Sequence, residues 1–372
     1  MQYVAYGRNG PMISRLGFGC MRLPLRKKND NSAVNYAKTR RIIRAALHGG
    51  VNFFDSHAGY HGGNSELALG RALRGWKSPV VIQTKQPWYN DQPIAWFEKL
   101  LAQSLEKLGV GCIDFLFHHY MTMDNWKRRG RQFIRFTNWA IRRGLIRHRG
   151  FSSHETNENI RAFIDTGEFH AMLVPHNWLN PIYQDTIAYA AERGMGVSIM
   201  NPVAGGFLAM STPQVLRLLP GAKTAGEVGI RYALATPAVA AALSGMNEME
   251  QAIENVATAS RRVPMTPRQW ARMRERLKKV ESQAAAFCTS CGYCMPCPHS
   301  VDIPGNFQAW NRERFFGQTK LATLEYASLK NSKSGNRSAE ACKQCGRCEP
   351  KCPNRVPIMR TLKTVARALS VR

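Results

Sequence analysis

The stretch VNFFDSHAGYHGGNSELALGRALRG, residues 51–75, holds a strand pattern, a loop and a helix pattern in that order. Its first part, VNFFDSH, is a short apolar run rich in β-branched and aromatic residues, which is typical of a buried strand. Its last part, SELALGRALRG, carries apolar residues at helical spacing and ends on a glycine, as helix C-termini often do. The order strand, loop, helix predicts one unit of an α/β fold.

The same alternation runs from the start of the chain to about residue 256. Strand patterns occupy residues 16–20, 51–57, 80–85, 112–119, 149–154, 171–177, 196–202 and 241–246. Eight strands, each followed by a helix, favour a closed (β/α)8 TIM barrel. The doubly wound alternative expects a Gly-x-Gly-x-x-Gly turn after the first strand, and GFGCMRL (17–23) does not supply it.

Charge and composition limit the classes of protein that fit. A hydrophobic content of 44% suits a large folded core, and no apolar run approaches the roughly 18 residues of a membrane helix. The N-terminal residues lack the pattern of a signal peptide, so we expect a cytoplasmic protein with no membrane partner. Lys and Arg number 52 against 25 Asp and Glu, a net charge of +27. Because these cations are spread along the chain, a solvated surface is favoured over a nucleic-acid site.

Four types of polar side chain, an acid, a phenol, an amine and an imidazole, follow three adjacent strands of the predicted barrel. Asp55 and Tyr60 follow the second strand, Lys85 ends the third, and His118 and His119 end the fourth. Chemistry in such barrels gathers at the carboxyl ends of the strands. This set suits carbonyl reduction: the phenol donates a proton, and a neighbouring ammonium is expected to lower the phenol pKa. The carboxylate holds the ammonium, and an imidazole orients the substrate oxygen.

With these residues the chain resembles the aldo/keto reductases over about residues 1–256. The segments that carry the resemblance are YGRNGPMISRLGFGCMRLP (6–24), the Asp-x4-Tyr segment 50–73, IQTK (82–85) and IDFLFHH (113–119). The family places its histidine five residues after the aspartate of that strand, which selects His119 over His118. The resemblance implies Asp55 as anchor, Tyr60 as acid, Lys85 as pKa modulator and His119 as substrate orienter.

The resemblance also implies a nicotinamide cofactor bound without a Rossmann fold. Its expected contacts are Ser152, Ser153, Asn177, Pro202, Gly205, Gly206, Glu254 and Asn255. Four positions depart from the family pattern. Met200 stands for a stacking aromatic, Leu173 for a glutamine, and Gly245 and Gln251 for the cations that grip a 2′-phosphate. These departures leave NADPH, NADH and a flavin open as cofactors.

Eight of the ten cysteines fall in two clusters, CTSCGYCMPCP (288–298) and CKQCGRCEPKCP (342–353). The second cluster has the Cys-x2-Cys-x2-Cys-x3-Cys-Pro spacing of [4Fe–4S] ferredoxins, and the first is one residue shorter in its last gap. The fourth cysteine of such a run ligates the other cluster. The expected sets are Cys288, Cys291, Cys294 with Cys352, and Cys342, Cys345, Cys348 with Cys297. Zinc is the alternative, and the repeated spacing favours iron–sulfur.

These patterns divide the chain into a barrel (1–265), a charged linker helix (266–287) and a small, mainly helical ferredoxin-like iron–sulfur domain (288–372). The tail resembles the ferredoxin module fused to a subgroup of aldo/keto reductases. The leading hypothesis is therefore an oxidoreductase of that type, acting on a small-molecule carbonyl and carrying two [4Fe–4S] clusters.

Two alternatives stay open. The first is an electron-transfer reductase without nicotinamide, fed through the clusters by an acidic ferredoxin or flavodoxin. The second is a nucleic-acid-binding or iron-sensing protein on a barrel scaffold. The chain lacks basic motifs with interleaved aromatics, which disfavours nucleic acid as a partner.

Overall fold

The computed structural model describes residues 1–372 except 28–29, 285–287, 289, 291, 333–334, 353 and 371–372. These residues form two compact units. The first comprises residues 1–176, 182–202 and 230–265, and the second comprises 177–181, 203–229 and 266–372. No helix in the described ranges is long and apolar enough to span a bilayer.

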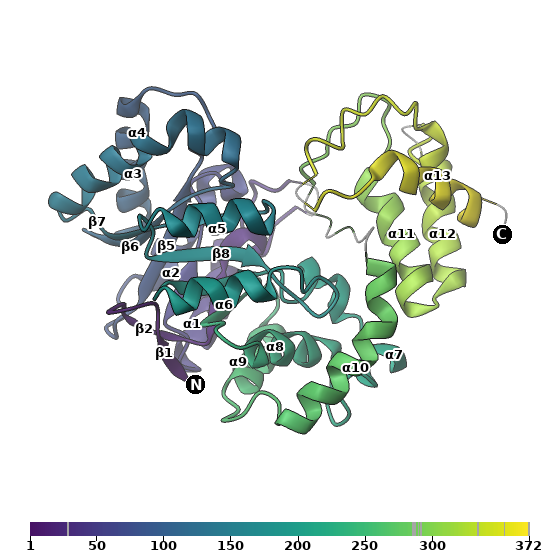
Figure 1. The fold of residues 1–372 in the computed structure, drawn as a ribbon, viewed down its shortest axis with the longest axis horizontal. Coiled ribbons are helices and arrows are strands. Elements are labelled where there is room, and N and C mark those ends of the chain that lie inside the picture. The colour runs from purple at the N-terminus through teal and green to yellow at the C-terminus, as the bar shows by residue number, and fades with distance from the viewer. Residues whose placement is uncertain are drawn as a thin grey trace. The chain divides into compact units, whose positions relative to one another are not determined.

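The first unit is built on a closed barrel of eight parallel strands, as the sequence predicted (Figure 1). The strands are β3 (Leu16–Gly19), β4 (Phe53–Asp55), β5 (Val81–Gln86), β6 (Ile113–His118), β7 (Ile146–Ser152), β8 (Ala171–Pro175), β9 (Gly196–Met200) and β10 (Ala241–Ser244). They pair in chain order, and β10 closes the ring against β3. Each strand lies within the range that the sequence predicted for it, with two exceptions. β5 ends one residue later than predicted, and β7 begins three residues earlier.

Helices connect the strands. They are α1 (Tyr36–His48), α2 (Asn64–Leu73), α3 (Ile94–Leu108), α4 (Met123–Arg142), α5 (Asn157–Asp165), α6 (Gln184–Glu192), α7 (Pro213–Leu216), α8 (Ala225–Ala235) and α9 (Met249–Ala259). A hairpin of β1 (Tyr3–Ala5) and β2 (Met12–Ser14) precedes the barrel. Side-chain caps start several helices; Thr122 and Asn125 form a capping box at α4, for example.

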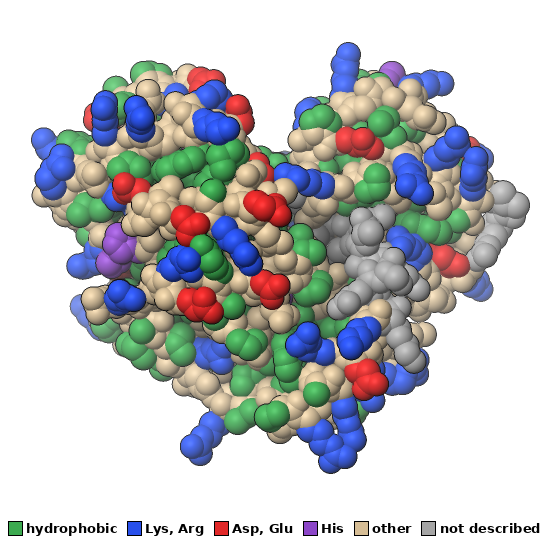
Figure 2. Space-filling model, viewed as in Figure 1, with side chains coloured by type: hydrophobic (Ala, Val, Ile, Leu, Met, Phe, Trp, Pro, Cys, Tyr) green, Lys and Arg blue, Asp and Glu red, His purple; other side chains and the backbone are tan. Residues whose placement is uncertain are grey.

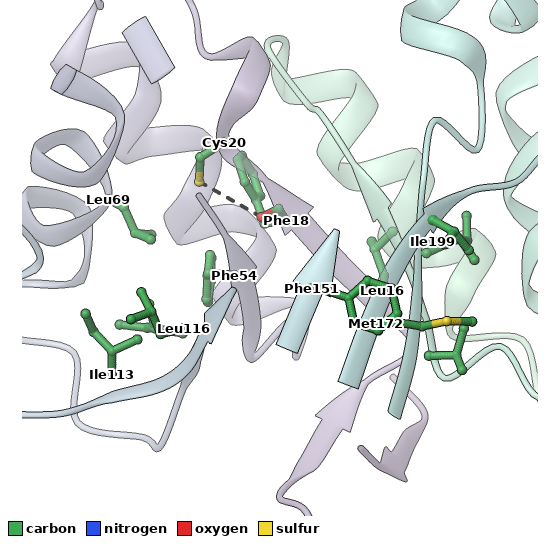
Figure 3. Close-up of a cluster of buried hydrophobic side chains, with 14 of the residues drawn as sticks. Leu16, Phe18, Cys20, Phe54, Leu69, Ile113, Leu116, Phe151, Met172 and Ile199 are labelled. Carbon is green, nitrogen blue, oxygen red and sulfur yellow. Dashed lines mark hydrogen bonds between the residues drawn. The ribbon is translucent and has the colours of Figure 1, made fainter. Parts of the chain in front are cut away.

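Alternate residues of each strand pack on opposite faces of the barrel wall. One set joins the helices in an outer hydrophobic layer, and Figure 3 shows Phe54 and Leu116 of this set with Leu69 of α2. The other set fills the barrel interior, where Tyr6 of the N-terminal segment packs with it; the set includes Phe53, Val81, Phe115, Phe117, Leu173 and Leu243. Burying a large apolar side chain contributes about 1.5–3 kcal/mol, so both layers stabilise the barrel.

Two interior positions of the strands require glycine because neighbouring side chains come too close. A Cβ on Gly17 would lie 2.4 Å from Leu243 and 2.9 Å from Phe53. A Cβ on Gly150 would lie 2.2 Å from the Phe117 ring and 2.6 Å from the Ala171 carbonyl oxygen. The small residues let the large interior side chains fill the barrel.

The second unit contains α10 (Pro267–Ala284), α11 (Ile303–Phe316), α12 (Thr319–Lys330) and α13 (Ile358–Leu369). Ile303 and Phe307 of α11, Tyr326 of α12, and Leu362 and Val365 of α13 belong to one buried core. No strand occurs in the described residues beyond 265, so the mainly helical tail matches the prediction. α10 corresponds to the predicted linker helix 266–287, whose last three residues lie outside the described ones.

The division into units differs from the expected domain boundaries, because 177–181 and 203–229 group with the tail and not with the rest of 1–265. Specific contacts within the second unit explain this for the segment after β9. The Phe207 ring lies 5.1 Å from the Phe316 ring. Arg312 donates a hydrogen bond to the Met210 sulfur at 2.6 Å.

The positive charge is dispersed on the face of the molecule that Figure 2 shows. Lys and Arg side chains are spread there among hydrophobic and polar groups. They do not gather into a single patch on that face.

Candidate active site and cysteine clusters

Strand geometry brings the predicted acid–base residues to one end of the barrel. Asp55 ends β4, Lys85 lies near the end of β5, and His119 directly follows β6. Each is two residues beyond a side chain that faces the barrel interior, namely Phe53, Gln83 and Phe117. Because side chains alternate along a strand, all three share the interior face. Tyr60 begins a 3-10 turn (Tyr60–Gly63) in the loop after β4.

A buried ion pair joins Lys85 to Asp55. The distance between Lys85 Nζ and Asp55 Oδ2 is 2.7 Å, and the side chains are 1% and 7% exposed. Lys85 Nζ also donates to the Ser56 carbonyl oxygen at 2.6 Å. Burial raises the pKa of Asp55, and the Lys85 ammonium acts against that rise. The pair therefore holds the ammonium in one position.

The ammonium lies over the ring of Tyr60, 5.1 Å from its centroid. The pKa of Tyr60 is nevertheless raised above its ordinary value, first by burial and then by the Asp55 carboxylate. The expectation that Lys85 lowers this pKa was wrong in its net direction. The physical reason is that desolvation of the phenol, followed by the negative charge of Asp55, disfavours the phenolate. The phenol consequently keeps its proton at neutral pH, as a proton donor requires.

Of the two histidines at the end of β6, His119 stands beside the phenol. The His119 ring lies 6.2 Å from the Tyr60 ring. Burial, together with the nearby His57 and Lys85, lowers the pKa of His119 well below its ordinary value, so the imidazole is neutral. His118 packs on the other face of the wall, 5.3 Å from the Phe133 ring of α4, as its position in the strand predicted.

His57 is a member of this group that sequence reasoning missed. Its ring lies 4.1 Å from the His119 ring and 5.0 Å from the Tyr60 ring. The available signal was its place in the loop after β4, two residues beyond Asp55. A lone histidine in such a loop is usually structural, and only the packed rings distinguish it.

A chain of hydrogen bonds behind the ion pair was also missed. Gln83 Nε2 donates to Asp55 Oδ1 at 2.7 Å, and Gln83 Oε1 accepts from the Tyr6 hydroxyl at 3.0 Å. The Tyr6 hydroxyl is 2.7 Å from Ser198 Oγ. These side chains are buried, so both oxygens of the Asp55 carboxylate have a fixed donor.

Two of the residues expected to contact a nicotinamide, Ser152 and Ser153, lie at the end of β7. Ser152 Oγ, at the end of β7, accepts from the Tyr120 amide at 3.0 Å. Ser153 Oγ donates to the Met121 carbonyl oxygen at 2.7 Å. These bonds tie the expected carboxamide contacts to the loop that follows His119.

The remaining expected contacts lie in two loops and in α9. Asn177 Oδ1 accepts from the amide of Leu179 at 3.0 Å and from that of Asn180 at 2.9 Å. Pro202 is buried, and Gly205 and Gly206 adopt positive φ angles of 67° and 99°. Glu254 and Asn255 lie on α9, and Asn255 Nδ2 donates to Ser244 Oγ at 3.1 Å.

The structure assigns roles to two of the departures. Gln251 Oε1 accepts from the backbone amides of Asn247 and Glu248, at 2.8 and 3.2 Å, so this side chain caps α9. Gly245 lies against Arg22, and a Cβ there would be 3.3 Å from Arg22 Cβ. Arg22 follows β3, and sequence reasoning did not single it out.

Most of the expected cluster ligands line two cavities of the second unit. The larger, of about 210 Å³, is lined by Cys297, Cys342, Cys345 and Cys348, and also by Cys294. The smaller, of about 20 Å³, is lined by Cys288, Cys294 and Cys352. Cys291 lies outside the described residues. Cysteines of both runs therefore line each cavity, and Cys294 lines both.

None of the nine described cysteines forms a disulfide. In the described part of the chain, no three His, Cys, Asp or Glu side chains converge on the position of a single metal ion. Zinc needs four ligands at bond distance from one point. Thiols around a cavity instead suit a larger inorganic group, such as an iron–sulfur cluster.

Comparison with known proteins is consistent with this architecture. Residues 15–216 match the model of the aldo/keto reductase family, and residues 287–358 match that of the 4Fe-4S dicluster domain. The chain is 24% identical over 284 residues to the uncharacterized oxidoreductase YqkF of Bacillus subtilis, covering 67% of this chain and 88% of that protein. It is 24% identical over 253 residues to the NADH-specific methylglyoxal reductase of Escherichia coli, covering 61% and 74%.

The fold also matches solved structures. The aldo-keto reductase AKR11C1 of Bacillus halodurans, in its holo form, superposes with a TM-score of 0.64 at 23% identity. The match covers 74% of this chain and 96% of that one. At this identity the likeness shows the fold alone.

Proposed function

The chain belongs to the aldo/keto reductase family and carries a 4Fe-4S dicluster domain, and on that premise we propose that it reduces a small-molecule carbonyl with Tyr60 as the proton donor. The observation that carries the proposal is the buried Asp55–Lys85 pair, whose ammonium lies over the Tyr60 ring beside a neutral His119. These residues follow or end three adjacent strands, and their side chains surround the Tyr60 phenol.

A nicotinamide supplies a hydride to the carbonyl carbon when bound. The Tyr60 hydroxyl gives its proton to the carbonyl oxygen, so the C=O bond becomes an alcohol. His119 orients that oxygen as a neutral hydrogen-bond partner. The Asp55–Lys85 pair holds the ammonium 5.1 Å from the ring centroid of Tyr60, where it stabilises the phenolate left behind.

The residues around the strand ends fit a nicotinamide in part. Ser152 accepts from the Tyr120 amide, and its own hydroxyl proton has no other partner within the described residues, so it suits a carboxamide oxygen. Gln251 is engaged in capping α9 and does not grip a 2′-phosphate. We therefore favour NADH over NADPH, which agrees with the name of the Escherichia coli relative.

The test is the Tyr60→Phe variant, assayed for carbonyl turnover with NADH and with NADPH. We expect turnover to be abolished while iron content is unchanged. The matched control is Tyr89→Phe, which removes a phenol whose ring lies 5.9 Å from His119 and which has no place in the acid–base set. Turnover retained in Tyr60→Phe would refute the assigned role.

We further propose that the second unit holds two [4Fe–4S] clusters. Cys342, Cys345, Cys348 and Cys297 would bind one, and Cys288, Cys291, Cys294 and Cys352 the other. Each cluster would supply one-electron transfer. Cys345→Ala should halve the bound iron, and Cys112→Ala, a cysteine of the barrel, should leave it unchanged.

A second candidate function is an electron-transfer reductase that takes electrons from an acidic carrier and not from a nicotinamide. The observation in its favour is that Lys343, Arg347 and Lys351 line the same cavity as the cysteines. An anaerobic absorption spectrum before and after addition of NADH or NADPH separates the candidates. Bleaching of cluster absorbance places nicotinamide on the electron path. Neither bleaching nor carbonyl turnover would favour the external carrier.

A further inference from the structure

His57 is a buried titratable group that the acid–base set does not use. Its ring lies 4.1 Å from the His119 ring and 5.0 Å from the Tyr60 ring, and 6% of the residue is exposed. It therefore stands beside both groups that hold the substrate oxygen. Any ligand oxygen bound between Tyr60 and His119 would have this imidazole as a neighbour.

The hydrogen bonds of the ring determine where its proton lies. The Gly59 amide donates to His57 Nδ1 at 2.9 Å, so this nitrogen is an acceptor and carries no proton. Burial, reinforced by the Lys85 ammonium, lowers the pKa of His57 to about 3, so the ring is neutral. A neutral imidazole holds one proton, and it must lie on Nε2.

This donor lacks an acceptor. His57 Nε2 is buried and has no hydrogen-bond partner within the described residues. Buried donors in folded proteins are nearly always paired, and an exception at a functional site calls for an explanation. His119 Nδ1 is likewise buried without a partner in the described residues, so two unpaired imidazole nitrogens belong to adjacent rings beside Tyr60.

Resting on the proposed function, we propose that His57 Nε2–H binds a second oxygen of the substrate, on the carbon next to the carbonyl. Substrates that carry such a second oxygen are α-hydroxy and α-oxo carbonyl compounds. Because the His57 and His119 rings lie only 4.1 Å apart, an oxygen on the carbon next to the carbonyl is the substrate acceptor nearest to this donor. A neutral donor suits a hydroxyl or oxo group, since the nearby Lys85 charge is already paired with Asp55.

Hydroxyacetone and butan-2-one test the proposal, because they differ only in a hydroxyl against a methyl group next to the carbonyl. We expect the ratio of their kcat/KM values to fall about tenfold in His57→Phe, the loss expected for one hydrogen bond. The matched control is His154→Phe, a buried imidazole packed 5.8 Å from the Tyr120 ring, which should keep the wild-type ratio. An unchanged ratio in His57→Phe, with both ketones turned over, overturns the inference and leaves the proposed function standing.

A binding measurement tests the same contact without turnover. In protein labelled with isotopic nitrogen at histidine, the signals of His57 are those lost in His57→Phe. They should report a proton on Nε2, and they should shift with hydroxyacetone and not with butan-2-one. Such a shift without turnover of either ketone would support the contact and refute the proposed function. A proton on Nδ1, or equal responses to the two ketones, overturns the inference.

Discussion

Replacing Gln83 by leucine tests whether the carboxylate of the Asp55–Lys85 pair depends on side chains of the barrel interior. The amide nitrogen of Gln83 donates to Asp55 Oδ1 at 2.7 Å, and its oxygen accepts from the Tyr6 hydroxyl at 3.0 Å. Leucine has a similar volume and neither group. The variant therefore removes two hydrogen bonds and leaves little cavity.

The expected loss of unfolding free energy follows from the hydrogen-bond partners that Asp55 and Tyr6 keep in the variant. Asp55 loses one donor to a buried charge, which costs about 1.5–3 kcal/mol of unfolding free energy. Tyr6 keeps Ser198 Oγ at 2.7 Å, so its loss adds little. We expect a decrease of about 2 kcal/mol, which corresponds to a fall in Tm of about 4–8 °C for a unit of this size.

The loss of stability in Gln83→Leu should be larger at neutral pH than at acidic pH. Burial raises the folded-state pKa of Asp55, and the Gln83 amide opposes that rise by binding the ionised carboxylate. Ionisation of Asp55 therefore costs stability as the pH rises through this pKa, and it costs more in the variant. The difference between wild type and Gln83→Leu should be full at neutral pH and should narrow as the pH falls through the pKa of Asp55.

The assay is urea unfolding of the iron-loaded chain, followed by circular dichroism at neutral and mildly acidic pH, together with kcat for carbonyl reduction. The matched control is Thr84→Val, which removes a hydroxyl donor, at 2.6 Å, to the buried carboxylate of Glu66. Glu66 keeps Ser104 as a donor at 3.0 Å. We expect both variants to lose stability, and only Gln83→Leu to lose kcat as well. Equal kcat in the two variants, or a stability difference independent of pH, would refute the reasoning.

Three further predictions concern the same barrel. Lys85→Met leaves the buried Asp55 carboxylate unpaired and should lower the unfolding free energy by about 3–5 kcal/mol, and adding Asp55→Asn should recover most of this loss in the same denaturation assay. Because the pKa of Tyr60 is raised, carbonyl reduction should keep its proton donor up to about pH 10 and beyond; a pH–rate profile that declines well below that value through loss of this proton would contradict the direction. Gly150→Ala places a methyl group 2.2 Å from an aromatic ring of β6 and should cost about 3 kcal/mol or more, whereas Gly111→Ala, with nothing within 4 Å, should cost little when both are unfolded by heat.

The sequence alone predicted much of the barrel and of the acid–base set. The alternation of strand and helix patterns led to the closed sheet of β3 to β10. Strand periodicity of two residues separates His119, on the interior face, from His118, which packs against Phe133. These conclusions depend on local spacing, which the chain carries from residue to residue. The cysteine spacing is of the same kind, and described thiols of both runs line each of the two cavities.

Contacts between residues far apart in the sequence determine two features of the site that local spacing does not predict. Tyr6 and Gln83 are 77 residues apart, and no local pattern predicts that they meet behind Asp55. The direction of the Tyr60 pKa shift depends on the burial of the phenol and on the Asp55 carboxylate that the fold brings near it. Both are properties of the closed barrel.

The chain by itself thus determined which elements form and which functional groups stand at the strand ends, because those depend on neighbours in sequence. Tertiary structure alone decided the proton positions on Tyr60 and His57. Protonation depends on desolvation and on partners that only the folded barrel brings into contact.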